Sequence, residues 1–245
     1  MDEIVYYVGV GFIAQMIDGT LGMAYGVSAT SLLLTRGIAP AVASATVHAA
    51  EVFTTGISGV SHHYFGNVDR RLFWGLVIPG VIGAVVGAYI LSQIPGERFK
   101  PVIAVYLLGM GALIVVRVFR TAPPLSVTTH LTPLGFFGAF IDAVGGGGWG
   151  PVVASTLTAR GNHARLTVGS VNAAEFFVTL AASVTFIATM GLSHWPIILG
   201  LAIGGAIAAP LGAWACKRIP HRPFMLLVGL LVIGLSIRTL IKALT

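Results

Sequence analysis

A segment near the N-terminus of this chain returns in altered form in the second half. Residues 11–59 align without a gap with a segment about 124 residues later, and roughly a third of the aligned positions are identical, which marks a chain built from repeated units. The identical pairs include acids, glycines and arginines: Asp18 with Asp142, Gly22 with Gly146, Gly26 with Gly150, Arg36 with Arg160 and Glu51 with Glu175. The sequence therefore predicts two homologous copies of one structural unit.

The composition places these repeats in a membrane. Of 245 residues, 56% are hydrophobic and only 9% are charged, whereas about a quarter of the residues in a soluble domain are charged. Apolar runs at 72–91, 102–118, 172–190 and 224–237 are each close to the length that crosses a bilayer. We therefore expect an all-α polytopic integral membrane protein, multi-pass in the plasma (inner) membrane.

Charge and cysteine content exclude several other classes. The 14 basic residues against 8 acidic ones indicate charge at the membrane flanks, and no nucleic-acid partner is expected. The single Cys216 provides neither an intrachain disulfide nor a metal-ligand cluster, so neither a metal nor a cofactor is expected.

The expected organisation is a first transmembrane repeat at 1–120, a connector at 121–132 and a second transmembrane repeat at 133–245. Each repeat has about four hydrophobic segments. The first segments, at 4–34 and about 134–159, are too long for one crossing and contain the glycine-rich stretches 19–26 and 144–151. Because each glycine costs a helix about 1 kcal/mol relative to alanine, we expect helix, loop and helix, with both breaks facing the interior.

The helix that restarts after each break, near Val27 and near Pro151, directs free N–H groups and a positive dipole end inward. Two such starts predict a site for a small anion. The alternative is that the glycines are only close-packing points between helices, an interpretation that suits Gly83, Gly87 and Gly212. The candidate substrate-binding residues in the breaks are Gly22, Met23, Tyr25, Gly26, Gly146, Gly147, Gly148, Trp149 and Gly150.

The next segment of each half carries a polar stripe at helical spacing. The members are Ser44, His48, Glu51, Thr55, Ser58 and His62 in the first half, and Asn172, Glu175, Thr179 and Ser183 in the second. Glu51 and Glu175 are candidates for proton coupling because acids inside membrane helices are costly. A purely structural role, with each acid neutral and hydrogen-bonded, is equally open. His48 and Asn172 join the candidate substrate-binding residues, whereas Asp18 and Asp142 are expected to be structural acids at the helix breaks.

The first half contains five short motifs: the Ile-Asp-Gly-x-Leu-Gly-Met break at 17–23, His-Ala-Ala-Glu at 48–51, Ser-Gly-x-x-His at 58–62, Gly-Asn-Val-Asp at 66–69 and Pro-Gly-x-x-Gly-Ala at 79–84. Together they resemble those of the sulfite exporter TauE/SafE family of membrane transporters. The resemblance implies secondary transport of small sulfur-containing anions: sulfite, sulfonates such as sulfoacetate, or thiosulfate. Buried acids beside an anion make proton coupling a reasonable expectation. Asn172 stands where the first half has His48, so any proton role of this histidine is not symmetric.

Other functions remain open at this stage. An anion channel, or a transporter of another small organic or inorganic anion, is compatible with the same architecture of two membrane repeats. A membrane scaffold would tolerate loss of Glu51. An enzyme is not expected, because His48-Ala-Ala-Glu51 is too short for a zinc protease motif and no nucleophile has a recognisable setting.

The distribution of basic residues favours two repeats of opposite orientation, each with a first segment that turns back at its glycines. That arrangement places Arg70, Arg71, Arg117, Arg120, Arg160, Arg165, Lys217, Arg218 and Arg222 inside the cell, and Arg36, Arg98, Lys100, Arg238 and Lys242 outside.

Overall fold

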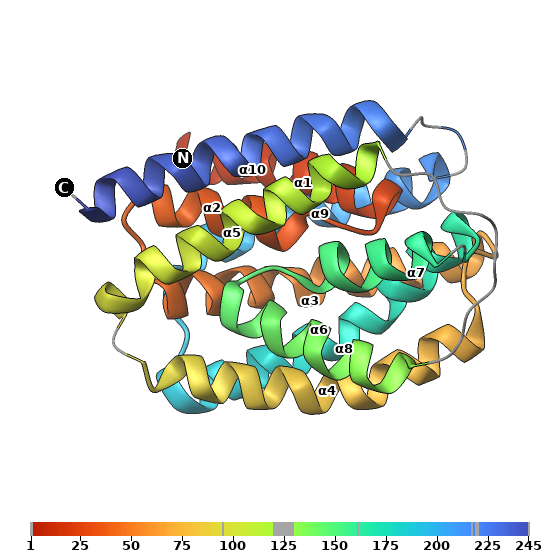
Figure 1. The fold of residues 1–245 in the computed structure, drawn as a ribbon, viewed down its shortest axis with the longest axis horizontal. Helices are drawn as coiled ribbons and strands as arrows, with labels where there is room; N and C mark the ends of the chain where they lie inside the picture. Colours follow the sequence, from red (N-terminus) through yellow and green to blue (C-terminus); the bar gives the residue numbers. More distant parts are fainter. Residues whose placement is uncertain are drawn as a thin grey trace.

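The computed structural model describes residues 2–94, 96–119, 130–160, 162–216, 218 and 221–244, and every regular element in these ranges is a helix. The long helices lie side by side in a bundle (Figure 1). In the first half of the chain the helices are α1 (Asp2–Leu21), α2 (Tyr25–Thr35), α3 (Pro40–Tyr64), α4 (Arg70–Ser92) and α5 (Gly96–Val118). In the second half they are α6 (Leu131–Gly145), the π-helix η1 (Gly150–Ala154), α7 (Ser155–Ala159), α8 (Ala164–Met190), α9 (Trp195–Ala215) and α10 (His221–Leu244).

The prediction of a polytopic all-α membrane protein is confirmed. Within the described ranges, six helices are long and apolar enough to cross a bilayer: α1, α4, α5, α8, α9 and α10. Helix α3 has 25 residues and is long enough, but its polar stripe lowers its hydropathy. The expected connector at 121–132 lies outside the described residues except for its last three positions.

Two helix pairs from opposite halves pack closely through glycines: α1 with α9, and α4 with α6. A Cβ added at Gly212 would lie 3.0 Å from the Cα of Gly19. Gly83 and Gly87 similarly face the backbone of Phe136 and Phe140. The close-packing interpretation of Gly83, Gly87 and Gly212 is therefore confirmed, in keeping with the use of small residues where membrane helices approach each other.

Helix α2 runs back along α1 toward its starting end. Arg36, which directly follows α2, donates a hydrogen bond from Nη1 to the Tyr7 hydroxyl at 3.2 Å and lies over the ring of Tyr6 at 4.5 Å. The end of α10 reaches the same place, since Lys242 Nζ donates to the Thr35 carbonyl at 3.3 Å. The beginning of α1, the end of α2 and the end of α10 therefore lie together, at the left in Figure 1.

Helix α7 lies against the C-terminal end of α5, at the end of the bundle opposite to the contacts of Arg36 and Lys242. Arg117, in the last turn of α5, donates from Nη1 to the carbonyl of Ser155, the first residue of α7, at 3.0 Å. Figure 1 shows α7 toward the right of the bundle, whereas α2 lies toward the left.

Helices α3 and α8 pack against each other in the middle of the molecule. Their facing sides carry buried polar residues, among them Glu51, Thr55, Asn172 and Thr179. Apolar residues form two separate clusters, one around α1, α2 and α9 and the other around α4, α6 and α8. The buried polar sides of α3 and α8 therefore lie between these two apolar clusters.

Candidate functional site

Both glycine-rich breaks form where the sequence predicts them. Helix α1 ends at Leu21 and α2 begins at Tyr25, while α6 ends at Gly145 and η1 begins at Gly150. Each α-helix is stopped by a glycine with positive φ, Gly22 at 70° and Gly146 at 67°, a backbone conformation that glycine adopts without steric cost. Pro151 occupies the first turn of η1, where its missing N–H removes no helical hydrogen bond.

The two breaks meet in the interior. A Cβ added at Gly26 would lie 2.8 Å from the Cα of Gly147. One added at Gly150 would fall against the backbone of Met23, and one at Gly147 against that of Val27. The glycines thus allow the two interrupted backbones to touch, so the expectation that both breaks face inward is met by direct contact between them.

The breaks are tied together by hydroxyl groups as well. Thr30, on α2, donates a hydrogen bond to the carbonyl of Gly146. Tyr106, on α5, donates to the carbonyl of Gly147 at 2.7 Å, and a Cβ at Gly148 would collide with the Tyr106 hydroxyl. Sequence reasoning missed Thr30 and Tyr106, because neither belongs to a motif and each reaches the other half of the chain only after folding.

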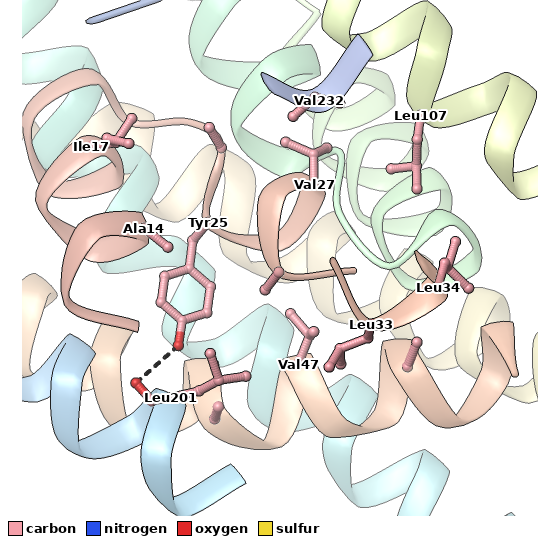
Figure 2. Close-up of a cluster of buried hydrophobic side chains, with 14 of the residues drawn as sticks. Ala14, Ile17, Tyr25, Val27, Leu33, Leu34, Val47, Leu107, Leu201 and Val232 are labelled. Carbon is pink, nitrogen blue, oxygen red and sulfur yellow. Dashed lines mark hydrogen bonds between the residues drawn. The ribbon is translucent and has the colours of Figure 1, made fainter. Parts of the chain in front are cut away.

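The side chains of Tyr25 and Trp149 point away from the contact between the breaks. Figure 2 shows Tyr25 directed at α9, where its hydroxyl donates to the Leu201 carbonyl at 3.2 Å. The indole Nε1 of Trp149 donates to the Val171 carbonyl in α8 at 3.1 Å. The two aromatic side chains belong to different apolar clusters, so they do not flank a common space in this structure.

A histidine of the first half is paired with an acid of the second. Nε2 of His48, on α3, lies 3.1 Å from Oδ2 of Asp142, on α6, and both side chains are buried. His48 Nδ1 lies 2.8 Å from the carbonyl of Ser44, and since a carbonyl can only accept, Nδ1 carries a proton. The hydrogen bond between Nε2 and Oδ2 therefore contains one further proton, held by either partner.

Asp142 also fixes the second break. Its Oδ1 accepts a hydrogen bond from the backbone N–H of Trp149 at 3.0 Å. One oxygen of the carboxyl group thus accepts from Trp149, the residue that precedes η1, and the other oxygen contacts His48. This contact is an acceptor role of the kind expected for an acid next to a helix start.

Four of the chain's eight acidic residues gather around the breaks. We call this group the carboxyl cluster: Asp18, Glu51, Asp142 and Glu175, all of them buried. Glu51 interacts electrostatically with Asp18, Asp142 and His48, and Glu175 interacts with the other three acids. Glu51 also faces the first break directly, since its Oε1 lies 3.2 Å from the position of a Cβ on Gly26.

Several polar atoms near the carboxyl cluster have no hydrogen-bond partner among the described residues. The amide oxygen of Asn172 accepts from Ser58 at 2.7 Å, and the same amide interacts with the Asp18 carboxyl, but its Nδ2 has no hydrogen bond of ordinary geometry. Oδ2 of Asp18, Oε2 of Glu175 and both amide atoms of Gln15 are also unpaired. Buried polar groups are rarely left without a partner, so this group of atoms indicates a place for water, protons or a polar ligand.

The described ranges contain no group of three or more His, Cys, Asp or Glu side chains that could hold a metal ion. Within them the shortest charged contact of the site is the His48–Asp142 pair. The described site contains carboxyl, imidazole, hydroxyl and amide side chains, which are groups that can hold protons or form hydrogen bonds.

Gly147→Ala is expected to lower the free energy of unfolding by about 3 kcal/mol or more. Gly147 has a φ of 148°, and a Cβ there would fall against the backbone of Gly26 and Val27. Thermal unfolding of the purified protein in detergent measures the effect. Gly9→Ala is the matched control, since no heavy atom lies within 4 Å of its added Cβ. Equal stability of the two variants would contradict the close contact between the breaks.

A membrane-spanning helical bundle with two interrupted helices and a buried polar centre has the build of a membrane transporter. The family model for the sulfite exporter TauE/SafE matches residues 7–239, and the chain belongs to this family. It is also 44% identical over 252 residues to the probable membrane transporter protein YtnM of Bacillus subtilis (strain 168), an alignment that covers 99% of this chain and 84% of the relative. The resemblance read from the motifs is thereby confirmed: the protein is a multi-pass membrane transporter and not an enzyme.

Proposed function

We propose that the protein is a proton-coupled secondary transporter of small sulfur-containing anions in the plasma membrane. The observation that carries this proposal is the meeting of the two helix breaks beside the carboxyl cluster. Helix starts supply N–H groups and a positive dipole end for an oxyanion. The neighbouring carboxyls supply groups that bind and release protons. The family name agrees with a sulfur oxyanion as the substrate class.

The charges of the site support proton coupling. Asp142 is paired with His48, which also interacts electrostatically with Glu51, but Asp18, Glu51 and Glu175 form no ion pair of their own among the described residues. An unpaired charge in a low-dielectric interior costs far more than a neutral, hydrogen-bonded group. An entering anion would add to the negative charge unless protons entered with it. Movement of the anion together with protons removes this conflict.

In this structure the breaks touch, and their glycines leave little room between them. We propose that the substrate binds where the breaks separate, in a second conformation of the transport cycle. The residues exposed by that separation are those of the breaks, Gly22, Met23, Gly26 and Gly146 to Gly150, with His48 and Asn172 beside them. Tyr25 and Trp149 were also expected to bind the substrate, but their side chains are held elsewhere, and their backbone N–H groups are engaged by Asp18 and Asp142.

We further propose that the two halves are inverted repeats. The contacts at the ends of the helices support this arrangement. Lys242 reaches the end of α2 at one end of the bundle, and Arg117 reaches the start of α7. Arg117 and Lys242 occupy corresponding positions of the two halves, but the helices that they contact lie toward opposite ends of the bundle in Figure 1. Arg36 and Arg160 also occupy corresponding positions.

The inverted arrangement predicts that Arg36 and Arg160 lie on opposite sides of the membrane. Single cysteines at these two positions, in a Cys216→Ala background, are expected to react with a membrane-impermeant thiol reagent from opposite sides. Cys216 is buried and is the single native cysteine, so its replacement leaves a clean background. Labelling of both positions from the same side of intact cells would refute the inversion.

Binding of candidate anions to the purified protein tests the substrate class. Sulfite, thiosulfate, sulfate, sulfoacetate and chloride are compared by isothermal titration at two pH values. Saturable binding of a sulfur oxyanion that strengthens at the lower pH would support the proposal. Equal and pH-independent binding of chloride would contradict it.

A further inference from the structure

A groove opens between α3, α4 and α8, and none of the four acids of the carboxyl cluster lines it. It has a volume of about 780 Å³. Its floor contains Gly56 and Gly59 of α3, and its walls include the aromatic side chains of Phe73, Trp74 and Phe177. Trp74 is 59% exposed and Phe177 is 40% exposed. Two of these helices, α4 and α8, are long and apolar enough to cross the membrane, so we expect the groove to face lipid.

Only one end of the groove is charged. Arg70, the first residue of α4, and His63, in the last turn of α3, line that end, and both are exposed. The nearby carboxylate of Asp69 is occupied as the N-cap of α4, accepting from the backbone N–H groups of Arg71 and Leu72. The exposed aromatic ring of Tyr64 lies at the same end, and tyrosine is enriched at the level of lipid headgroups.

We propose that this groove binds an anionic phospholipid, with one acyl chain along the apolar floor and the phosphate at Arg70 and His63. The shape and charge match this ligand, since an apolar channel ends at the guanidinium of Arg70, with His63 beside it as a further hydrogen-bonding group. Basic pockets between membrane helices bind anionic lipid headgroups, above all on the cytoplasmic side. The orientation proposed above places Arg70 on that side.

The groove also connects the lipid to the transport machinery. Thr55 lies at its floor, and its hydroxyl oxygen is 3.4 Å from the hydroxyl oxygen of Thr179 of α8. Thr55 also donates to the Glu51 carbonyl, one helical turn away. A lipid in the groove therefore contacts the two helices that carry Glu51 and Glu175.

Native mass spectrometry of the delipidated full chain, titrated with phosphatidylglycerol and with phosphatidylcholine of identical acyl chains, tests the proposal. The wild-type protein is expected to bind phosphatidylglycerol about fivefold more tightly. Arg70→Gln should remove this preference. Arg71→Gln is the matched control, because Arg71 is the exposed neighbour and does not line the groove; it should keep the preference.

A second variant tests the apolar part of the groove. Val60 lines the groove and is 72% exposed, so Val60→Trp should fill it without disturbing the core and should weaken binding of both lipids. Retention of the preference in Arg70→Gln, or its equal loss in Arg71→Gln, would overturn the proposal. Disulfide crosslinking of two copies through Val60→Cys in membranes would also overturn it, since a second copy of the chain would then cover the groove.

Discussion

Glu51→Gln is expected to abolish the pH dependence of transport and to lower its rate on the order of 100-fold, the scale on which positioned proton-transfer groups act. Glutamine keeps the size and hydrogen-bonding capacity of the side chain but cannot carry a proton in exchange. Glu51 lies against the first residues of α2 and interacts with Asp18, Asp142 and His48. Flux into proteoliposomes at several pH values measures the effect. Glu175→Gln should behave alike, because its carboxyl belongs to the same cluster.

The control for these variants is Glu3→Gln. Glu3 is an acid on the exposed beginning of α1, far along the helix from the break. It should transport as the wild type does. All three proteins should unfold at similar temperatures, since the substituted groups stay polar and of equal size. Wild-type rates and pH dependence in Glu51→Gln would show that this acid has only a structural role.

Asp142→Ala is expected to destabilise the protein by about 3 to 5 kcal/mol, the usual cost of breaking a buried charged pair by removing one partner. The substitution removes the acceptor for the Trp149 N–H and leaves His48 Nε2 without its partner. The break before η1 should then lose its fixed geometry. Thermal unfolding in detergent and the yield of monodisperse protein measure this loss.

Asp142→Asn separates the structural part of this residue's role from its proton chemistry. An asparagine oxygen can still accept from Trp149, and its amide can donate to a neutral His48. This variant should therefore be much more stable than Asp142→Ala, yet transport should change because the shared proton is gone. Equal destabilisation by alanine and asparagine would contradict the hydrogen-bond assignment around Asp142.

The sequence predicted the positions of the breaks well because their cause is local. Glycines at 22 and 146 have positive φ in the structure, and no neighbour in space is needed to read that preference. The polar stripe could also be predicted from the local sequence, since helical spacing alone puts His48 and Glu51 on one face. Both residues are buried on that face.

What the sequence could not predict depends on contacts between distant segments. His48 and Asp142 are 94 residues apart, and nothing in either motif names the other as its partner. The directions of the Tyr25 and Trp149 side chains could not be predicted for the same reason. The two residues occupy equivalent positions in the two breaks, but each side chain donates to a carbonyl of a different helix. Tyr106 contributes to the second break from α5, a helix that reads as plain and apolar.

Protons and a sulfur oxyanion are proposed to move together through the place where the breaks meet. The most direct test of this coupled movement is uptake of sulfite or sulfoacetate into proteoliposomes under an imposed proton gradient, with internal pH recorded at the same time. Coupled transport should give saturable accumulation of the anion against its own gradient, an accompanying pH change, and loss of both when a protonophore is added. Flux that does not saturate, only follows the anion gradient and ignores the proton gradient would contradict it and identify an anion channel.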